Sequence, residues 1–318
     1  MVFSISNSIK TARNTFAHLN NDGLATSIGD IWSIKKILLL DYYMPAFSQI
    51  IRSPKSNFKK CYFADPFCGS GIFTKFKDPE LKNETFPGSA LIGALNASKL
   101  GYTDCIFSEM DSKNVNALNS RLQKSKTRLK NIEYSAQTLE FEKFVEKILK
   151  IRKYQVAVLI LIDPDGYVPI KWRLMEKLIK QVGVDIILNF YTHRIAQNVS
   201  ASKKKSEHEQ NLNEFFGDQE WKKIRDIRVN TNVLGQKLLN HYLDKVRSIP
   251  DKTAIDIGVY KKGDNKLYDL VLITRSTGGA NVMRRAKEVM NNATTEAIKR
   301  EFKAQLGSQS RLLEHGFQ

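Results

Sequence analysis

The sequence predicts an α/β fold: a doubly wound sheet of seven mainly parallel strands, with an antiparallel last strand and a helical insertion before the final hairpin. Three observations predict it. Apolar strand-like runs alternate with amphipathic helical segments from residue 60 to residue 191. Residues 197–247 then carry basic, helical sequence without a strand signal. Two strand-like runs around the turn KKGDNK predict a closing antiparallel hairpin. We expect residues 1–318 to form a single α/β domain.

The N-terminal part of the chain supplies the first strand and the loop behind it. Residues 1–30 are polar and rich in Asn and Ser, which predicts an N-terminal arm that is loose or forms short helices. Asp30 is a typical helix N-cap, and the apolar spacing behind it predicts a helix that ends before Pro54. KCYFADPF, residues 60–67, is the first predicted strand. A long loop containing glycine and proline follows at residues 69–89.

The middle of the chain continues the alternation of helix and strand. The run VAVLILI, the fourth strand, is apolar at every position, which is typical of strands buried on both faces of a parallel sheet. Residues 280–318 are predicted to be a basic C-terminal helix and tail. The remaining predicted elements are helices at 90–101, 112–126, 139–153 and 172–182 and strands at 104–111, 132–136 and 184–191.

The charge balance favours an anionic partner. The chain has 50 Lys and Arg against 33 Asp and Glu, a net charge of +17. Such a field attracts polyanions, so we expect nucleic acid, RNA or DNA, as a partner. Each basic cluster taken alone is more typical of a solvated helix face than of a nucleic-acid site. The clusters are Lys124, Lys126, Arg128 and Lys130; Lys203, Lys204 and Lys205; Lys222, Lys223, Arg225 and Arg228; and Arg284, Arg285 and Lys287.

Cysteine usage and hydropathy indicate the compartment. Cys61, Cys68 and Cys105 are odd in number and show no CxxC spacing, so neither a disulfide framework nor a zinc site is predicted. No apolar run approaches the roughly 20 residues of a membrane span. The N-terminus lacks the apolar stretch of a signal peptide. We therefore expect a cytoplasmic protein without membrane association.

The stretch DPFCGSG at the end of the first strand predicts a ligand site. Ligands of open parallel sheets bind beyond the carboxyl ends of the strands. Gly69 and Gly71 permit close approach of backbone to a ligand, and Asp65 places a carboxylate beside it. The spacing is neither a phosphate loop nor GxGxxG. An acid before the glycines suits a cationic amino-acid ligand, and the α-ammonium of S-adenosylmethionine fits; the alternative is a plain tight turn.

Two later strand ends support the same site. Glu109 ends the second strand, at the position where a carboxylate of such folds accepts hydrogen bonds from ribose hydroxyls. Asp111 is a lower-ranked candidate for the same role. Asp163 and Pro164 end the fourth strand, beside the position of a donated methyl group. Amino-group methyltransferases carry Asp or Asn, two prolines and an aromatic residue there, which hold the target amine and stack on its base. This chain has Asp165 in place of the second proline. The alternative role of Asp163 is that of a strand-end residue in a turn, with Pro164 only setting the bend.

The chain resembles the three-Cys-motif partner family (TcmP), a group related to class I methyltransferases. The matching stretches are WSIKKILLLDYY, FADPFCGSG, FPGSALIGAL, LILIDPDG, FFGDQEW and YDLVLITRS, which span most of residues 32–276. The resemblance implies a Rossmann-like class I methyltransferase fold. It also implies a partner, a radical-SAM three-Cys-motif protein. Family members usually have an aromatic residue at the position of Asp165, so the chain departs from the pattern there, and Tyr167 carries the displaced aromatic ring.

The same stretches also resemble bacterial ribosomal-RNA adenine-N6 methyltransferases. That resemblance places Lys35 and Lys36 on a Lys-His pair and Phe67 on a histidine of the cofactor loop. It also places Ser89 on a serine of the cofactor site, Glu109 on the ribose acid and Asp163 on the catalytic acid. Together with the residues assigned above, the predicted cofactor-binding residues are Lys35, Asp65, Phe67, Gly69, Gly71, Ser89 and Glu109, and the predicted catalytic residues are Asp163 and Pro164. The two histidines are absent from this chain.

Three functions remain open from the sequence. The first is a methyltransferase that uses S-adenosylmethionine as cofactor and modifies a base amine of nucleic acid, with Asp163 orienting the amine and the Pro164 carbonyl assisting. The second is a non-catalytic module that keeps the cofactor fold and serves a partner, which the missing histidines favour. The third is a nuclease, which requires that Asp65, Asp163 and Asp165 form a metal cluster. Residues 197–247 are the expected substrate-recognition insertion, or else a capping helical pair.

Overall fold

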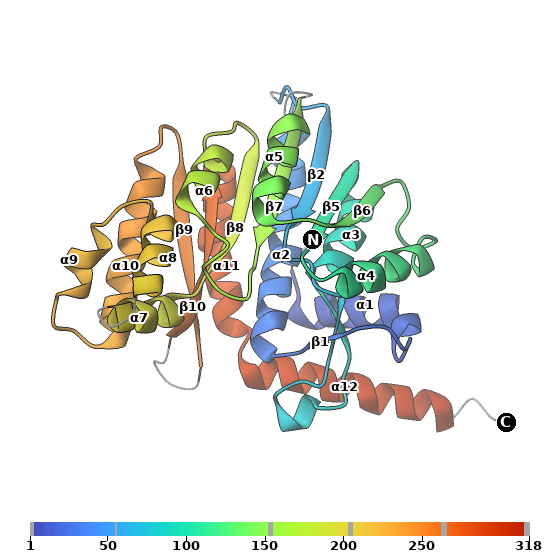
Figure 1. The fold of residues 1–318 in the computed structure, drawn as a ribbon. Helices are drawn as coiled ribbons and strands as arrows, with labels where there is room; N and C mark the ends of the chain where they lie inside the picture. The colour runs from blue at the N-terminus through green and yellow to red at the C-terminus, as the bar shows by residue number, and fades with distance from the viewer. Residues whose placement is uncertain (1–2, 55, 152–154, 203–205, 262–265, 315–318) are drawn as a thin grey trace.

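The central sheet has the predicted architecture (Figure 1). The computed structural model describes residues 3–54, 56–151, 155–202, 206–261 and 266–314. Within them seven strands form one sheet in the order β6-β5-β2-β7-β8-β10-β9. They are β2 (Lys60–Asp65), β5 (Asp104–Glu109), β6 (Glu133–Thr138), β7 (Val156–Ile162), β8 (Val184–Phe190), β9 (Thr253–Tyr260) and β10 (Lys266–Thr274). The first five run parallel, whereas β10 is antiparallel to both β8 and β9.

Helices cover both faces of this sheet, and β7 shows how the sequence assigns them. Its Ala157, Leu159 and Leu161 face one apolar cluster, and the alternate residues from Val156 to Ile162 face the other. One layer contains α2 (Ile31–Ile51), α3 (Ser89–Leu100), α4 (Ser112–Lys124) and α11 (Thr277–Asn292). The other contains α5 (Phe141–Ile151), α6 (Trp172–Ile179), α7 (Thr192–Ala201), α8 (Ser206–Phe216) and α10 (Thr231–Arg247). A strand with helices on both faces has no polar face, which explains its uninterrupted apolar run.

The N-terminal region is packed against the rest of the molecule. Helix α1 (Ile5–Phe16) buries Ile9, Ala12 and Phe16 in the cluster that also holds α2. A short 3-10 helix, η1 (Ala17–Leu19), follows it. Of the two forms expected for residues 1–30, a loose arm or short helices, residues 5–19 thus take the helical one, because one side of α1 is apolar enough to join the core.

A second, small sheet replaces the long loop expected over residues 69–89. It has the order β1-β3-β4, with β1 (Ser27–Ile28), β3 (Ile72–Thr74) and β4 (Phe86–Pro87). Strand β1 runs parallel to β3, and β4 runs antiparallel to it; the 3-10 helix η2 (Pro79–Leu81) lies between β3 and β4. No sequence pattern predicted this sheet, because its strands are two or three residues long and β1 comes from a distant segment.

Residues 197–247 form helices that share the core of the sheet. A short helix, α9 (Trp221–Arg225), joins α8 to α10. Phe215, Phe216 and Tyr242 pack with Trp172 of α6 and Phe190 of β8 in ring contacts. The first of these helices, α7, begins at Thr192, directly after β8. The basic cluster at residues 203–205 lies outside the described residues.

The C-terminal helices close the face opposite these insertion helices. Helix α11 packs along α2 and β9, and α12 (Thr295–Glu314) reaches α1 (Figure 1). Phe302 of α12 is buried, and the guanidinium of Arg13 lies 4.7 Å from the centre of its ring. Among the described residues no helix is both long and apolar enough to cross a membrane.

Candidate functional site

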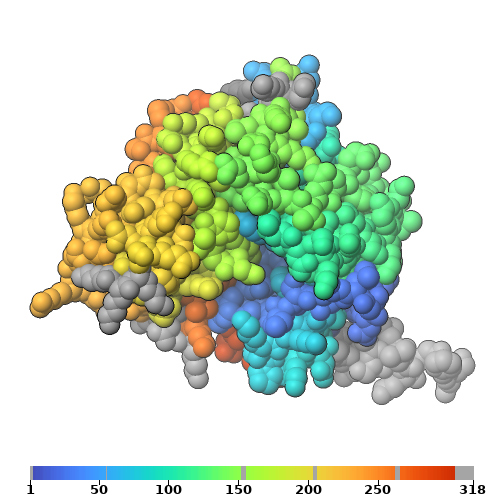
Figure 2. All heavy atoms as spheres, viewed as in Figure 1, coloured from blue at the N-terminus to red at the C-terminus, as the bar shows by residue number. Residues whose placement is uncertain are grey.

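Three strand ends meet at one edge of the sheet and carry the predicted carboxylates. Asp65 ends β2 and Glu109 ends β5, while Asp163 follows β7 directly. Because β2 lies between β5 and β7 and all three run parallel, their carboxyl ends share one edge. Figure 2 shows the surface hollowed on the viewed face, between the blue N-terminal part of the chain and the yellow-green part around β7.

Asp65 is a fully buried carboxylate held by two hydrogen bonds. Its Oδ2 accepts from Ser89 Oγ at 2.6 Å, and its Oδ1 accepts from the Phe67 amide at 3.0 Å. Burial raises the pKa of Asp65 to about 7, against the opposing effect of these hydrogen bonds. The nearby charges of Asp163 and Glu109 contribute to this raised pKa in the same direction as burial. A cation beside Asp65 would relieve this cost.

The loop behind Asp65 has backbone geometry that favours its glycines. Gly69 and Gly71 have φ angles of +56° and +86°, in the left-handed region. A Cβ on Gly71 would lie 2.8 Å from Leu118 Cδ1, and one on Gly69 would lie 3.3 Å from Ser27 Oγ. The Gly71 carbonyl also accepts from the Gly88 amide at 2.7 Å, just before α3 begins at Ser89. A side chain at position 71 would therefore be strained at this φ and would require Leu118 to shift.

Glu109 joins the second strand end to this loop. Its Oε2 accepts from the Gly69 amide at 3.2 Å, and its Oε1 accepts from the Met110 amide at 2.7 Å and the Asp111 amide at 3.3 Å. Asp111 instead caps α4, since its Oδ1 accepts from the Lys113 amide at 2.8 Å. Of the two candidates for the ribose role, Glu109 is the one that contacts the glycine loop.

Asp163 is surrounded by partners that the sequence did not reveal. Lys36 of α2 forms an ion pair with its Oδ2. Its Oδ1 accepts from Asn189 Nδ2 at 2.7 Å and from the Tyr191 hydroxyl at 3.3 Å. The same hydroxyl donates to the Pro164 carbonyl. Asn189 is 3% exposed, and its Oδ1 has no hydrogen-bond partner among the described residues. One signal for these two residues was available: the apolar fifth strand ends in Asn-Phe-Tyr.

The other predicted residues lie around this cluster in different ways. The Lys35 ammonium lies 5.3 Å from the centre of the Trp32 ring, and burial lowers its pKa while Glu296 of α12 opposes the shift. Lys36, rather than Lys35, contacts Asp163. Phe67 is half-buried and stacks on Phe141 with ring centres 5.5 Å apart.

Tyr167 and Asp165 differ from the pattern of an amine-methylating site. The Tyr167 ring is buried and packs edge-on against Phe215, at 5.3 Å between ring centres, so it belongs to the core rather than to a base-stacking platform. Asp165 is exposed, and its backbone carbonyl accepts from Arg194 at 3.4 Å. The described residues contain no group of three or more His, Cys, Asp or Glu side chains suited to hold a metal ion. The metal cluster that the nuclease hypothesis requires from Asp65, Asp163 and Asp165 is therefore not formed.

Comparisons with known proteins give distant structural matches. No family model matches the chain, and no curated protein matches it. An O-methyltransferase from Bacillus cereus, solved in complex with SAH, is 10% identical with a TM-score of 0.40 over 84% of this chain and 90% of that chain. Protein LPL1258 from Legionella pneumophila is 13% identical with a TM-score of 0.47 over 83% and 91%. A precorrin-6y C5,15-methyltransferase from Geobacter metallireducens is 10% identical with a TM-score of 0.33 over 80% and 94%.

The family relationship implied by the sequence motifs remains a resemblance, because no family model matches. The architecture is read from the strands themselves. Five parallel strands in the order β6-β5-β2-β7-β8 are extended at one side by β10 and β9, with β10 inserted antiparallel between β8 and β9. The chain has a Rossmann-like class I methyltransferase fold.

Proposed function

We propose that this protein binds S-adenosylmethionine and methylates an amine of a nucleic-acid base. The observation that carries the proposal is the meeting of Asp65, Glu109 and Asp163 around the glycine loop, at the ends of three adjacent parallel strands. Each carboxylate has a distinct environment: one fully buried, one held by backbone amides, and one paired with a lysine.

The residues at β2 and β5 suit the two halves of this cofactor. Asp65 has a carboxylate whose negative charge is destabilised by burial, and no ion pair to it is formed among the described residues. An α-ammonium group fits that requirement. Glu109 is anchored by amides and suits ribose hydroxyls, while Gly69 and Gly71 keep the intervening backbone free of side chains. When bound, the cofactor supplies an electrophilic methyl group.

The residues at β7 and β8 suit an amine acceptor. The Asp163 carboxylate can accept hydrogen bonds from an amine. Asn189, which donates to Asp163 through Nδ2, offers its own unpaired Oδ1 as a second acceptor. A buried oxygen without a donor is destabilising, so an incoming N–H group is favoured there. Lys36 occupies Asp163 Oδ2, so an amine would compete with the lysine for this oxygen. Alignment of the acceptor supplies the rate, since a sulfonium donor needs no strong base.

The net charge of +17 supports nucleic acid as the acceptor. Helices α7 and α10 of the insertion adjoin the end of β8, because Gly235 of α10 packs against Thr192, the residue after Tyr191. The insertion is the proposed substrate-recognition region; its basic residues Lys222, Lys223 and Arg225 in α9 form ion pairs with Glu209, Glu220 and Asp226, with which a polyanion would compete.

A second candidate function is a non-catalytic module that retains the cofactor site. Three contacts favour it: Tyr191 occupies the Pro164 carbonyl, Lys36 occupies Asp163, and the Tyr167 ring is buried in the core. An acceptor base would find these groups already engaged. In that function the resemblance to the three-Cys-motif partner family suggests a radical-SAM three-Cys-motif protein as the partner.

Calorimetry with S-adenosylhomocysteine, followed by transfer of tritium from labelled S-adenosylmethionine to total RNA or DNA, separates these functions. Micromolar binding supports both candidates, and absence of binding refutes both. Asp163→Ala is expected to retain cofactor affinity but to lose methyl transfer, because β7 ends at the acceptor rather than beside Glu109. Asp165→Ala, two residues away with an exposed side chain, is the matched control and is expected to transfer normally. Tight binding without transfer by the wild type favours the module.

A further inference from the structure

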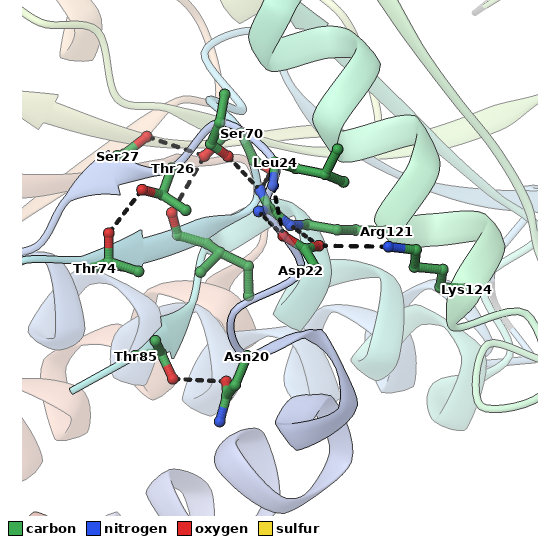
Figure 3. A network of polar contacts seen from close by, with 12 residues as sticks. Asn20, Asp22, Leu24, Thr26, Ser27, Ser70, Thr74, Thr85, Arg121 and Lys124 are labelled. Carbon is green, nitrogen blue, oxygen red and sulfur yellow. Dashed lines mark hydrogen bonds and ion pairs between the residues drawn. The ribbon is translucent and has the colours of Figure 1, made fainter. Parts of the chain in front are cut away.

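Arg121 of α4 is a fully buried charged side chain that lies behind the glycine loop (Figure 3). Its Nε and Nη2 donate to the two carboxylate oxygens of Asp22 at 3.0 and 2.8 Å. Its Nη1 donates at 2.7 Å to the backbone carbonyls of Ala25 and Ser70. One guanidinium thus links α4, the N-terminal segment and the glycine loop.

The Asp22 carboxylate is matched to this guanidinium. Its side chain is 5% exposed. Burial alone would raise its pKa, but the hydrogen bonds from Arg121 and from the Leu24 amide, with the charge of Arg121, hold the pKa below its ordinary value. The planar fork of arginine makes this two-point contact, and a lysine ammonium cannot reproduce it. Lys124, 3.9 Å away and 46% exposed, adds only a peripheral charge.

Residues 22–30, which we name the strap, continue from this anchor along the glycine loop. Strand β1 in the strap pairs with β3, and the Gly29 amide donates to the Thr74 carbonyl at 2.9 Å. The Thr26 and Thr74 hydroxyls share a hydrogen bond of 2.7 Å. Ser27 Oγ lies 3.4 Å from Ser70 Oγ and also limits the space at Gly69.

The strap leads directly into the helix that reaches Asp163. Asp30 caps α2 by accepting from the Trp32 amide at 3.3 Å, and Lys36 lies in the second turn of that helix. The strap therefore runs from Arg121, past the glycine loop, to the helix that engages the acceptor side of the site. A pocket of about 440 Å³ opens beside the anchor, with Leu24, Thr26 and Arg121 among its lining residues.

We propose that Arg121 is a positioning residue for the cofactor site. It fixes the Ser70 carbonyl, and hence the peptide that joins Ser70 to Gly71, and it holds the strap against the same loop. This inference rests on the proposed function in so far as the loop binds S-adenosylmethionine. The four hydrogen bonds of the buried guanidinium fix its position relative to Asp22, Ala25 and Ser70. The glycine loop that it holds is therefore preorganised before a ligand binds.

The test compares Arg121→Lys with Arg128→Lys, the same chemical change at an exposed position just beyond the same helix. Amide hydrogen exchange of the ligand-free proteins is measured first. We expect faster exchange in the strap and in residues 69–74 of Arg121→Lys, with β8 unchanged. Arg128→Lys should match the wild type throughout. Unchanged exchange in the strap and loop overturns the proposal, whether or not the protein binds any cofactor.

Calorimetry with S-adenosylhomocysteine then tests the consequence for the site. We expect Arg121→Lys to raise Kd about tenfold or more, and Arg128→Lys to leave it unchanged. If Arg121→Lys loosens the strap yet binds as tightly as the wild type, Arg121 is structural only and the inference fails. A wild type that does not bind refutes the proposed function instead, while the exchange result still decides whether Arg121 holds the loop. Should Arg121→Lys not fold, Asp22→Asn, which removes the charge of its partner, takes its place in both measurements.

Discussion

Asp65→Asn is expected to stabilise the ligand-free protein in a pH-dependent manner while weakening its binding of a cationic ligand. The asparagine amide keeps both hydrogen bonds, because Oδ1 still accepts from the Phe67 amide and Nδ2 donates to Ser89 Oγ. The substitution removes only the charge. The buried carboxylate of the wild type has its pKa raised from the ordinary 3.8 to about 7, so the folded state favours the protonated form.

The sign of the pH effect follows from the direction of that shift. A folded-state pKa above the unfolded one means that the stability of the wild type is greatest below 3.8 and is lost as pH rises through about 7. Between pH 5 and pH 7 this loss amounts to about 1.4 kcal/mol per pH unit. The free-energy gap between Asp65→Asn and wild type should therefore widen by about 3 kcal/mol from pH 5 to pH 8. At about 2 °C per kcal/mol, this is a relative Tm shift of roughly 6 °C.

Differential scanning calorimetry of both proteins from pH 5 to pH 8.5 measures this gap, and Asp185→Asn is the matched control. Asp185 is also a buried acid of the sheet, with its pKa raised to about 6 by burial, but it accepts from Tyr43 at 2.7 Å and lies away from the glycine loop. Its substitution should give about half the widening and leave affinity for S-adenosylhomocysteine unchanged. The reasoning would be refuted if the difference in unfolding free energy between Asp65→Asn and wild type stayed constant with pH. It would also be refuted if Asp65→Asn bound S-adenosylhomocysteine as tightly as the wild type.

Other predictions address the cofactor and the polyanion. Glu109→Ala should weaken S-adenosylhomocysteine binding by about 10- to 100-fold, because ribose hydroxyls lose a charged partner worth about 1.5–3 kcal/mol; calorimetry that finds wild-type affinity removes Glu109 from the site. Gly69→Val should abolish that binding, since a branched side chain at φ +56° meets Ser27 Oγ and fills the ligand's approach. Binding of nucleic acid should weaken steeply between 50 and 200 mM salt, through counterion release, in a fluorescence-anisotropy titration. An affinity that does not change with salt would indicate that the net charge of +17 does not serve nucleic-acid binding. Deleting residues 203–205, outside the described part of the chain, should lower the slope if the insertion contacts phosphates.

Local sequence patterns were enough to predict the order of the strands along the chain and the residues at their ends. Apolar runs bounded by Asp, Gly and Pro mark where a parallel strand ends. Such signals consist of neighbouring residues, so they can be recognised in the sequence alone. That is why Asp65, Glu109 and Asp163 could be assigned to one edge of the sheet before their distances were known.

The surroundings of those residues could not be predicted, because they depend on contacts between distant parts of the chain. The partners of Asp163 come from α2 and from the end of β8, and Arg121 meets a carboxylate 99 positions away in sequence. The small sheet that carries the strap is built from segments too short to have a periodicity. The buried place of Tyr167 depends on Phe215 in the insertion. Contacts of this kind depend on chain folding over long separations, and no local pattern of apolar and polar residues records which side chains it brings together.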